Sequence, residues 1–155
     1  MPATPPSIAE FLKGRRIAVT GVARDGKLPA NAIFRRLKSC GFEVVPVNPN
    51  ASEVEGAACY PDLRSVPASV DGVVIASPPA SGAGLVRQAA ERGIRHVWFH
   101  RSFGDGSVAE DALGECRAHG IEPIVGGCPL MFCGKVDVFH RCMAWWLQRR
   151  GRVPR

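Results

Sequence analysis

Glycine and cationic residues cluster near the start of the chain, in Gly-Val-Ala-Arg-Asp-Gly-Lys at residues 21–27. Gly21 allows a sharp backbone turn at a point where a Cβ would clash. Arg24 and Lys27 add positive charge to that turn. Backbone amides and cations arranged in this way bind anions, and phosphate above all. The segment therefore predicts a ligand that carries phosphate.

The flanking residues predict the elements that hold this turn. The apolar run Ile17–Val19 predicts a buried strand before it, and Pro29 suits the first turn of a helix after it. The positive end of that helix dipole would also attract an anion. Apolar periodicity and Gly or Pro breakers continue the alternation along the chain. They predict strands at 16–20, 42–47, 72–76, 96–99 and 121–125, and helices at 30–40, 80–92, 107–119 and 136–149.

This alternation predicts an α/β fold. We expect a Rossmann-like, doubly wound, mainly parallel five-stranded sheet with helices on both faces. A length of 155 residues fits a single domain over the whole chain. Residues 1–6 are expected to be a loose N-terminal segment, and residues 151–155 a basic, solvated tail.

Several local features carry their own expectations. Capping boxes of the form Ser-x-x-Glu predict that Ser7 and Ser107 begin helices. Pro46 predicts a bulge or an unpaired end in its strand, because proline lacks the N–H that an interior strand needs. Residues 51–69 are expected to form a loop. The last helix is expected to bury one side, made of Phe139, Cys142, Met143, Trp146 and Leu147.

The fold predicts where a ligand binds. In doubly wound sheets the ligand lies beyond the carboxyl ends of the strands, at the switch in strand order. Three segments are expected to meet in this crevice, namely residues 21–27, Asn48-Pro49 and Ser77-Pro78-Pro79. Because the first of them is cationic, the crevice is suited to a polyanionic small molecule.

Two common nucleotide motifs fail in this crevice. A nicotinamide dinucleotide needs Gly-x-Gly-x-x-Gly and an acid at the end of the second strand, where this chain has Asn48. A P-loop needs Ser or Thr after its Lys to bind Mg²⁺, where this chain has Leu28. A nucleotide with several phosphates and no free ribose diol fits what remains. Coenzyme A (CoA) is such a nucleotide, since its 3′-phosphate calls for cations rather than an acid.

At these positions the sequence resembles the stand-alone CoA-binding proteins. They share the Rossmann-like CoA-binding domain of the succinyl-CoA synthetase α subunit. The resemblance extends over about residues 12–150. It rests on residues 17–27, 41–50, 70–75, 96–99 and 126–129. The loop 21–27 together with Pro-Val-Asn-Pro at 46–49 is its most specific part.

The resemblance implies roles for eleven residues. Gly21, Val22, Ala23 and Arg24 would surround the pyrophosphate, with Arg24 and Lys27 supplying charge. Val47, Asn48 and Pro49 would border the adenine and ribose, and Ser77, Pro78 and Pro79 would line the path of the pantetheine arm. The chain departs from the family at Ala23, where Ser is common, and at residues 99–101, which replace a form that contains Gln.

Charge and cysteine content constrain the wider context. Of 20 Lys and Arg, eight lie in residues 1–38 and five in residues 141–155. Nucleic acid is disfavoured as a partner, because aromatic residues do not interleave with these basic ends. Six cysteines with no secretory signal and no membrane span predict a cytoplasmic protein with reduced thiols.

The histidines and cysteines do not form a recognisable catalytic or metal motif. Cys128, Cys133, His140 and Cys142 match no common zinc spacing, so no metal site is expected. His100 is expected to be a polar residue at the rim of the sheet. One hypothesis for a reaction is a mixed disulfide between Cys128 and the thiol of CoA.

The sequence thus predicts a protein that binds CoA or an acyl-CoA without catalytic machinery of its own. Two alternatives stay open. One is an NAD(P)-linked or acyl-CoA-transforming enzyme, and the other is a module that binds nucleic acid or protein through its basic ends. A homo-oligomer or a partner enzyme is compatible with each of them.

Overall fold

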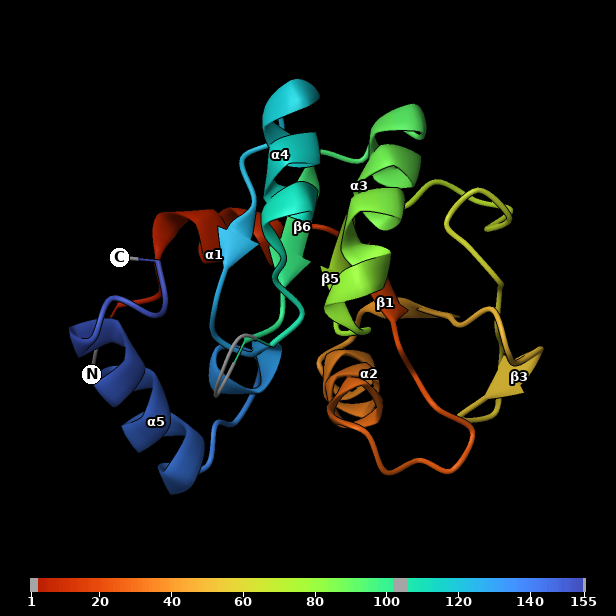
Figure 1. Ribbon diagram of the computed structural model, residues 1–155. Coiled ribbons are helices and arrows are strands. Elements are labelled where there is room, and N and C mark those ends of the chain that lie inside the picture. Colours follow the sequence, from red (N-terminus) through yellow and green to blue (C-terminus); the bar gives the residue numbers. More distant parts are fainter. Residues whose placement is uncertain (1–2, 102–105, 155) are drawn as a thin grey trace.

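Five parallel strands form the main sheet of the protein. They are β1 (Arg16–Thr20), β2 (Glu43–Val47), β5 (Gly72–Ile75), β6 (His96–Phe99) and β7 (Ile124–Val125). Their order in the sheet is β2-β1-β5-β6-β7, and each neighbouring pair is parallel (Figure 1). The computed structural model describes residues 3–101 and 106–154. The predicted α/β class and mainly parallel five-stranded sheet are confirmed.

Five α-helices and two short 3₁₀ turns accompany this sheet. The helices are α1 (Pro6–Phe11), α2 (Pro29–Ser39), α3 (Gly82–Glu91), α4 (Glu110–Ala118) and α5 (Val138–Arg149), and the 3₁₀ turns are η1 (Pro79–Ser81) and η2 (Pro129–Met131). Within the described part of the chain, none of these helices is long and apolar enough to cross a bilayer.

The central strands are apolar on both sides because both faces of the sheet are covered. Side chains alternate across the sheet, so Val74 and Trp98 enter one core while Val73 and Phe99 enter the other. Helices α2 and α5 contribute to the first core, and α3 and α4 contribute to the second. Figure 1 shows α3 and α4 side by side. This explains why the strands read as continuous apolar runs rather than alternating ones.

The strand order reverses at β1, which lies between β2 and β5. From β1 the chain crosses through α2 to β2 on one side, and the following strand of the sheet, β5, is on the other side. The carboxyl ends of β1, β2 and β5 therefore lie next to one another. Such a switch point leaves a crevice between the diverging loops, where doubly wound folds bind ligands.

Pro46 lies inside β2, without the bulge or unpaired end that was predicted. It is in register with Val19 of β1, and β2 is an edge strand. The carbonyl of Pro46 accepts a hydrogen bond from the Tyr60 N–H (3.1 Å), on the outer side of the edge. Since the N and C=O of one residue point the same way in a strand, the missing N–H also faces outward. Pro46 therefore removes no hydrogen bond between β1 and β2.

The predicted loop at 51–69 contains a short antiparallel hairpin. Its strands are β3 (Glu53–Val54) and β4 (Ala57–Ala58). At the other edge of the sheet, β7 is shorter than the predicted strand 121–125. The reason is that the Ile121 N–H closes the end of α4 by donating to the Cys116 carbonyl (2.8 Å), and Pro123 has no N–H to donate.

Both predicted capping boxes are wrong. Helix α1 begins at Pro6, with Pro5 as the N-cap and no side-chain cap. A proline at the first helical position is preset for the helix and needs no capping partner there. Helix α4 begins at Glu110 with Ala109 as N-cap, whereas Ser107 is buried in the preceding turn and its N–H donates to the His100 carbonyl (3.0 Å).

The last helix buries only part of the predicted side, since Leu147 is buried and Met143 is partly buried against the first core, whereas the other predicted residues are exposed. Ala144 and Leu147 are its buried residues, while Phe139 is 66% and Trp146 37% exposed. The C-terminal tail is not wholly solvated either, because Val153 is buried in the first core. Residues 1, 2 and 155 of the expected N-terminal segment and tail lie outside the described residues.

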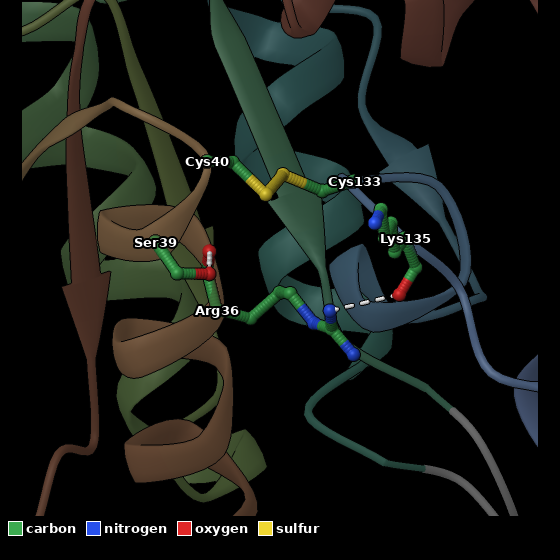
Figure 2. Close-up of a disulfide and its surroundings, with 5 residues drawn as sticks. All are labelled: Arg36, Ser39, Cys40, Cys133 and Lys135. Atoms are coloured by element: carbon green, nitrogen blue, oxygen red, sulfur yellow. Dashed lines mark hydrogen bonds between the residues drawn. A yellow bond between two sulfur atoms is a disulfide. The ribbon is translucent and has the colours of Figure 1, made fainter.

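A disulfide joins Cys40 and Cys133, contrary to the prediction of reduced thiols (Figure 2). Their Cα atoms are 6.5 Å apart although 93 residues separate them. The adjoining segments are also held by Arg36, whose guanidinium donates to the Lys135 carbonyl (3.0 Å), as Figure 2 shows. The pairing depends on the end of α2 meeting the segment after η2, a contact that cysteine spacing alone does not reveal.

We expect Cys40→Ser to lower the free energy of unfolding of the oxidised protein by about 2–4 kcal/mol, since the unfolded chain loses a long cross-link. Urea denaturation without reductant measures the difference. Cys142→Ser is the control, because Cys142 is an exposed free thiol. Adding a reductant should bring the wild type to the level of the variant. A wild type whose stability is insensitive to reductant would contradict the assignment.

Candidate functional site

A cavity of about 390 Å³ opens at the carboxyl ends of β1, β2 and β5. It lies at the switch point of the sheet, where the sequence predicted the crevice. The residues around it come from the loops after these strands, from the segment after β4 and from the start of α3. They are Thr20, Gly21, Ala23, Leu28, Val47, Asn48, Pro49, Asn50, Pro61, Asp62, Ser77, Pro78, Ser81, Gly84, Leu85 and Gln88.

Gly21 closes one side of this cavity by a tight backbone approach. Its φ is +85°, a conformation that favours glycine, and its N–H donates to the Val47 carbonyl (3.1 Å). A Cβ at this position would lie 2.8 Å from the Ala76 oxygen and 2.9 Å from the Ser77 backbone. Only glycine therefore lets the loop after β1 lie directly against the end of β5.

Asn48 ties the ends of β1 and β2 together. Its side-chain Nδ2 donates to the Val22 carbonyl (2.8 Å), and its Oδ1 accepts from the Asn50 N–H (2.8 Å). The first of these bonds needs a donor, so an aspartate could not make it at neutral pH. The amide at this position thus has a structural cause, besides the mismatch with a dinucleotide site that the sequence indicated.

Asn31 fixes the loop after β1 from the side of α2. This fully buried side chain accepts from the Ala23 N–H (3.0 Å) and donates to the Ala23 carbonyl (2.8 Å). Its Nδ2 also lies 2.8 Å from Glu55 Oε1. The sequence analysis missed Asn31, whose only signal was an amide two residues after Pro29 in the first turn of a helix.

The β3–β4 hairpin supports the same loop through Glu55. Glu55 lies at the hairpin turn with a φ of +52°, and its side chain is only 16% exposed. Its Oε1 accepts from Arg35 Nη1 (2.7 Å) as well as from Asn31, and Arg35 also donates to the Gly26 carbonyl (3.4 Å). The hairpin that was predicted as a loop thus braces the glycine turn.

Three hydroxyl groups, those of Thr20, Ser77 and Ser81, also line the cavity. Thr20 Oγ1 and Ser77 Oγ are 2.9 Å apart, and Ser77 Oγ is 2.9 Å from Ser81 Oγ. Ser81 donates in turn to the Pro78 carbonyl (2.8 Å). This chain of hydroxyls connects the end of β1 to the turn before α3, and it presents small polar groups to the cavity.

Seven of the eleven predicted site residues line the cavity. They are Gly21, Ala23, Val47, Asn48, Pro49, Ser77 and Pro78. Val22 is instead buried in the first core, and Arg24 and Lys27 project as exposed side chains of the same loop. Pro79 begins η1 outside the lining. The lining also includes Leu85 and Gln88 of α3, which sequence reasoning missed because they lie on a helix that only the fold brings to the strand ends.

Among the described lining residues, Asp62 is the one that carries a carboxylate. Hydrogen bonds from the side chain and backbone of Ser65 to Asp62 Oδ1, both 2.8 Å, lower the pKa of this carboxyl. Asp62 is therefore ionised at neutral pH and can accept hydrogen bonds from a ligand.

His100 and Cys128 lie outside the lining. His100 follows β6, and burial lowers the pKa of its imidazole, so that the ring is neutral at pH 7. Cys128 is 2% exposed and belongs to the first core. Among the described residues, no group of three His, Cys, Asp or Glu side chains is placed to hold a metal ion.

The sequence model of the CoA binding domain matches residues 15–133. This chain belongs to the CoA binding domain family. The match runs from the residue before β1 through the disulfide cysteine after η2, so it includes every strand of the sheet and the whole cavity wall. Helix α5 lies beyond the matched part of this CoA-binding domain.

Two ligases are among its curated relatives. ADP-forming acetate–CoA ligase II of Archaeoglobus fulgidus is 32% identical over 94 residues, which are 59% of this chain and 14% of the ligase. The alpha subunit of ADP-forming acetate–CoA ligase II from Pyrococcus furiosus is 32% identical over 88 residues, 56% of this chain and 19% of that subunit. The chain thus spans less than a fifth of either relative.

A solved structure of similar size shows the same fold. A conserved hypothetical protein from Pyrococcus furiosus is 36% identical, with a TM-score of 0.65 over 74% of this chain and 95% of that one. This chain therefore shares its fold with a solved protein that the match covers almost completely.

We expect Asn48→Asp to lower the free energy of unfolding by about 1–3 kcal/mol at neutral pH, because the Val22 carbonyl loses its donor and faces a carboxylate. Denaturant unfolding measures the loss of stability. This loss should become smaller as the pH falls, because the new carboxyl is then protonated and can donate. Asn50→Asp is the control, since Asn50 is exposed and uses its backbone N–H rather than its side chain. Equal losses for the two variants would contradict the role of the Asn48 amide.

Proposed function

We propose that this domain binds CoA or an acyl-CoA in the cavity at the switch point and has no catalytic groups of its own there. One observation supports this above the others. The cavity lies at the glycine turn of a chain in the CoA binding domain family, and seven residues expected to contact CoA line it.

The phosphates of the ligand would lie against the loop after β1. The N-terminal end of α2 adjoins this loop and has no acidic residue in its first turn. Its dipole therefore favours an anion. Arg24 and Lys27 are exposed on the same loop, and side chains of their length can reach a phosphate held outside the cavity wall. They are the groups expected to bind the 3′-phosphate or the pyrophosphate.

The remaining parts of CoA would occupy the cavity itself. Apolar side chains on its wall suit an adenine ring or a pantetheine chain, and they are Leu28, Val47, Pro49, Pro61, Pro78 and Leu85. The Asp62 carboxylate and the Gln88 amide are the polar partners for the adenine amino group or the amides of pantetheine. A cavity of this kind is mainly apolar with a few polar groups, as small-molecule sites usually are.

The wall carries little that could perform acid–base or nucleophilic catalysis. Its hydroxyl groups bond to one another and to backbone, and no histidine, cysteine or lysine is among the described lining residues. Activation of a serine needs an adjacent base. We therefore assign ligand binding, rather than chemistry on CoA, to this site.

Isothermal titration calorimetry with three nucleotides tests the proposal. CoA should bind most tightly, 3′-dephospho-CoA about tenfold more weakly because it lacks one charged group, and NAD more weakly still. The 3′-phosphate lies on the ribose of the adenosine, so the first two ligands differ only in that group. Equal affinity for CoA and NAD, or no binding of CoA, would overturn the proposal.

Removing either cation of the loop should weaken CoA. We expect Arg24→Ala and Lys27→Ala each to raise the dissociation constant roughly fivefold, about 1 kcal/mol, because the lost contact is exposed and screened. The dependence of affinity on salt should also become shallower. Lys38→Ala is the matched control, since Lys38 is an exposed cation near the other end of α2. If Lys38→Ala weakens binding as much, the loop has no special role.

A further inference from the structure

Helix α5 exposes an apolar face that the described part of the chain does not cover. Val138 is 73% exposed, Phe139 66%, Trp145 46% and Trp146 37%. The fifth exposed large apolar residue among those described, Leu28, lines the ligand cavity and so has a use. A hollow of about 460 Å³ lies on α5, between Phe139, Cys142, Met143, Trp145 and Trp146. Exposed apolar patches of this kind mark interaction surfaces.

The exposed residues form one stripe along the helix. Val138, Cys142, Trp145 and Arg149 follow at spacings of three and four, which places them on a single face. Ala144 and Leu147 lie on the opposite, inner face and are buried in the first core. The outer stripe therefore has no part in holding α5 to its own domain. Figure 1 shows α5 at the periphery, away from the loop after β1.

The two ends of this stripe carry opposite charges. Asp137 caps the start of α5. Its Oδ1 accepts from the N–H of His140 (2.9 Å) and its Oδ2 lies 2.6 Å from His140 Nδ1, and these contacts lower the pKa of the exposed carboxyl. At the other end Arg149 and Arg150 lie over the rings of Trp145 and Trp146, each 4.2 Å from the ring centroid. The apolar stripe thus runs from a negative end to a positive end.

We propose that this stripe is the interface with a second copy of the chain, formed by two antiparallel α5 helices about a two-fold axis near Cys142 and Trp145. An isologous interface must be complementary to itself. Antiparallel α5 helices meet this condition, because Asp137 of each copy faces the Arg149 and Arg150 end of the other. The two helix dipoles then run in opposite directions, which is the favourable arrangement. A parallel pair would place the arginines of both copies together.

This interface is independent of the proposed CoA site. None of the α5 residues lines the cavity at the switch point, so both cavities stay open in the dimer. The oligomeric state is therefore informative whatever the ligand proves to be.

Sedimentation equilibrium and thiol cross-linking test this dimer on the full chain. The wild type should sediment as a concentration-dependent dimer. A short bis-maleimide should join two chains through Cys142, which is the exposed free cysteine, while Cys59, Cys116 and Cys128 are buried. Cys142→Ser should abolish the cross-link without changing the sedimentation. A chain that remains monomeric at about 100 µM, as expected if the face serves a different macromolecule, overturns the proposal.

Two variants test whether a lost dimer results from the change at this interface or from unfolding of the chain. Phe139→Asp should raise the dimer dissociation constant at least about tenfold, since it replaces an exposed apolar side chain of this face by a charge. The double variant Arg149→Glu and Arg150→Glu should do the same, and circular dichroism should stay unchanged because these side chains are exposed. Lys38→Glu is the control for charge reversal elsewhere. A dimer that persists in both variants uses another surface and contradicts the assignment.

Discussion

The approach of the Gly21 backbone to Ala76 and Ser77 is the contact on which the site depends. A Cβ at position 21 would come within 2.8 Å of the Ala76 oxygen, and the φ of +85° disfavours any other residue. This contact lets the loop after β1 close over the end of β5 while its N–H bonds to Val47 of β2. Three strand ends are thereby joined at one point. The cavity exists because their loops diverge from there.

Two amide side chains and one ion pair hold this loop in place. Asn48 bridges to Val22, and Asn31 binds both backbone groups of Ala23. The partly buried carboxylate of Glu55 pairs with Arg35. No Lys or Arg is among the described residues that line the cavity, and Arg24 and Lys27 are exposed on the loop. A ligand with both an apolar body and phosphate groups suits this division, and CoA has both.

The cavity and the exposed apolar face of α5 lie on different parts of the molecule. The carboxyl ends of β1, β2 and β5 carry the cavity, whereas α5 carries apolar residues at the periphery. The disulfide joins the C-terminal end of α2 to the segment before α5. The family match ends at Cys133, so the residues that line the cavity belong to the shared domain and the α5 face lies outside it.

The sequence by itself determined the fold class, the strand that carries the glycine turn and seven of the residues that line the cavity. These follow from local signals, namely apolar runs bounded by glycine and proline, and a turn whose glycine has no substitute. It also determined that Asn48 ends the second strand, which argued against a dinucleotide. The capping boxes predicted the wrong first residue for two helices. Helix α1 begins at Pro6, because proline suits the first helical position, and α4 begins after Ser107, which is buried in the preceding turn.

Only the tertiary structure decided which residues from distant segments complete the site. Leu85 and Gln88 reach the cavity because α3 packs beside β5, and Glu55 braces the loop because the hairpin folds back onto α2. The buried side of α5 followed from contacts of Ala144 and Leu147 with the core, which its apolar periodicity could not distinguish from the outer stripe. The Cys40–Cys133 pair likewise required the fold. Local patterns specify elements, whereas contacts across 20 to 90 residues depend on how those elements pack.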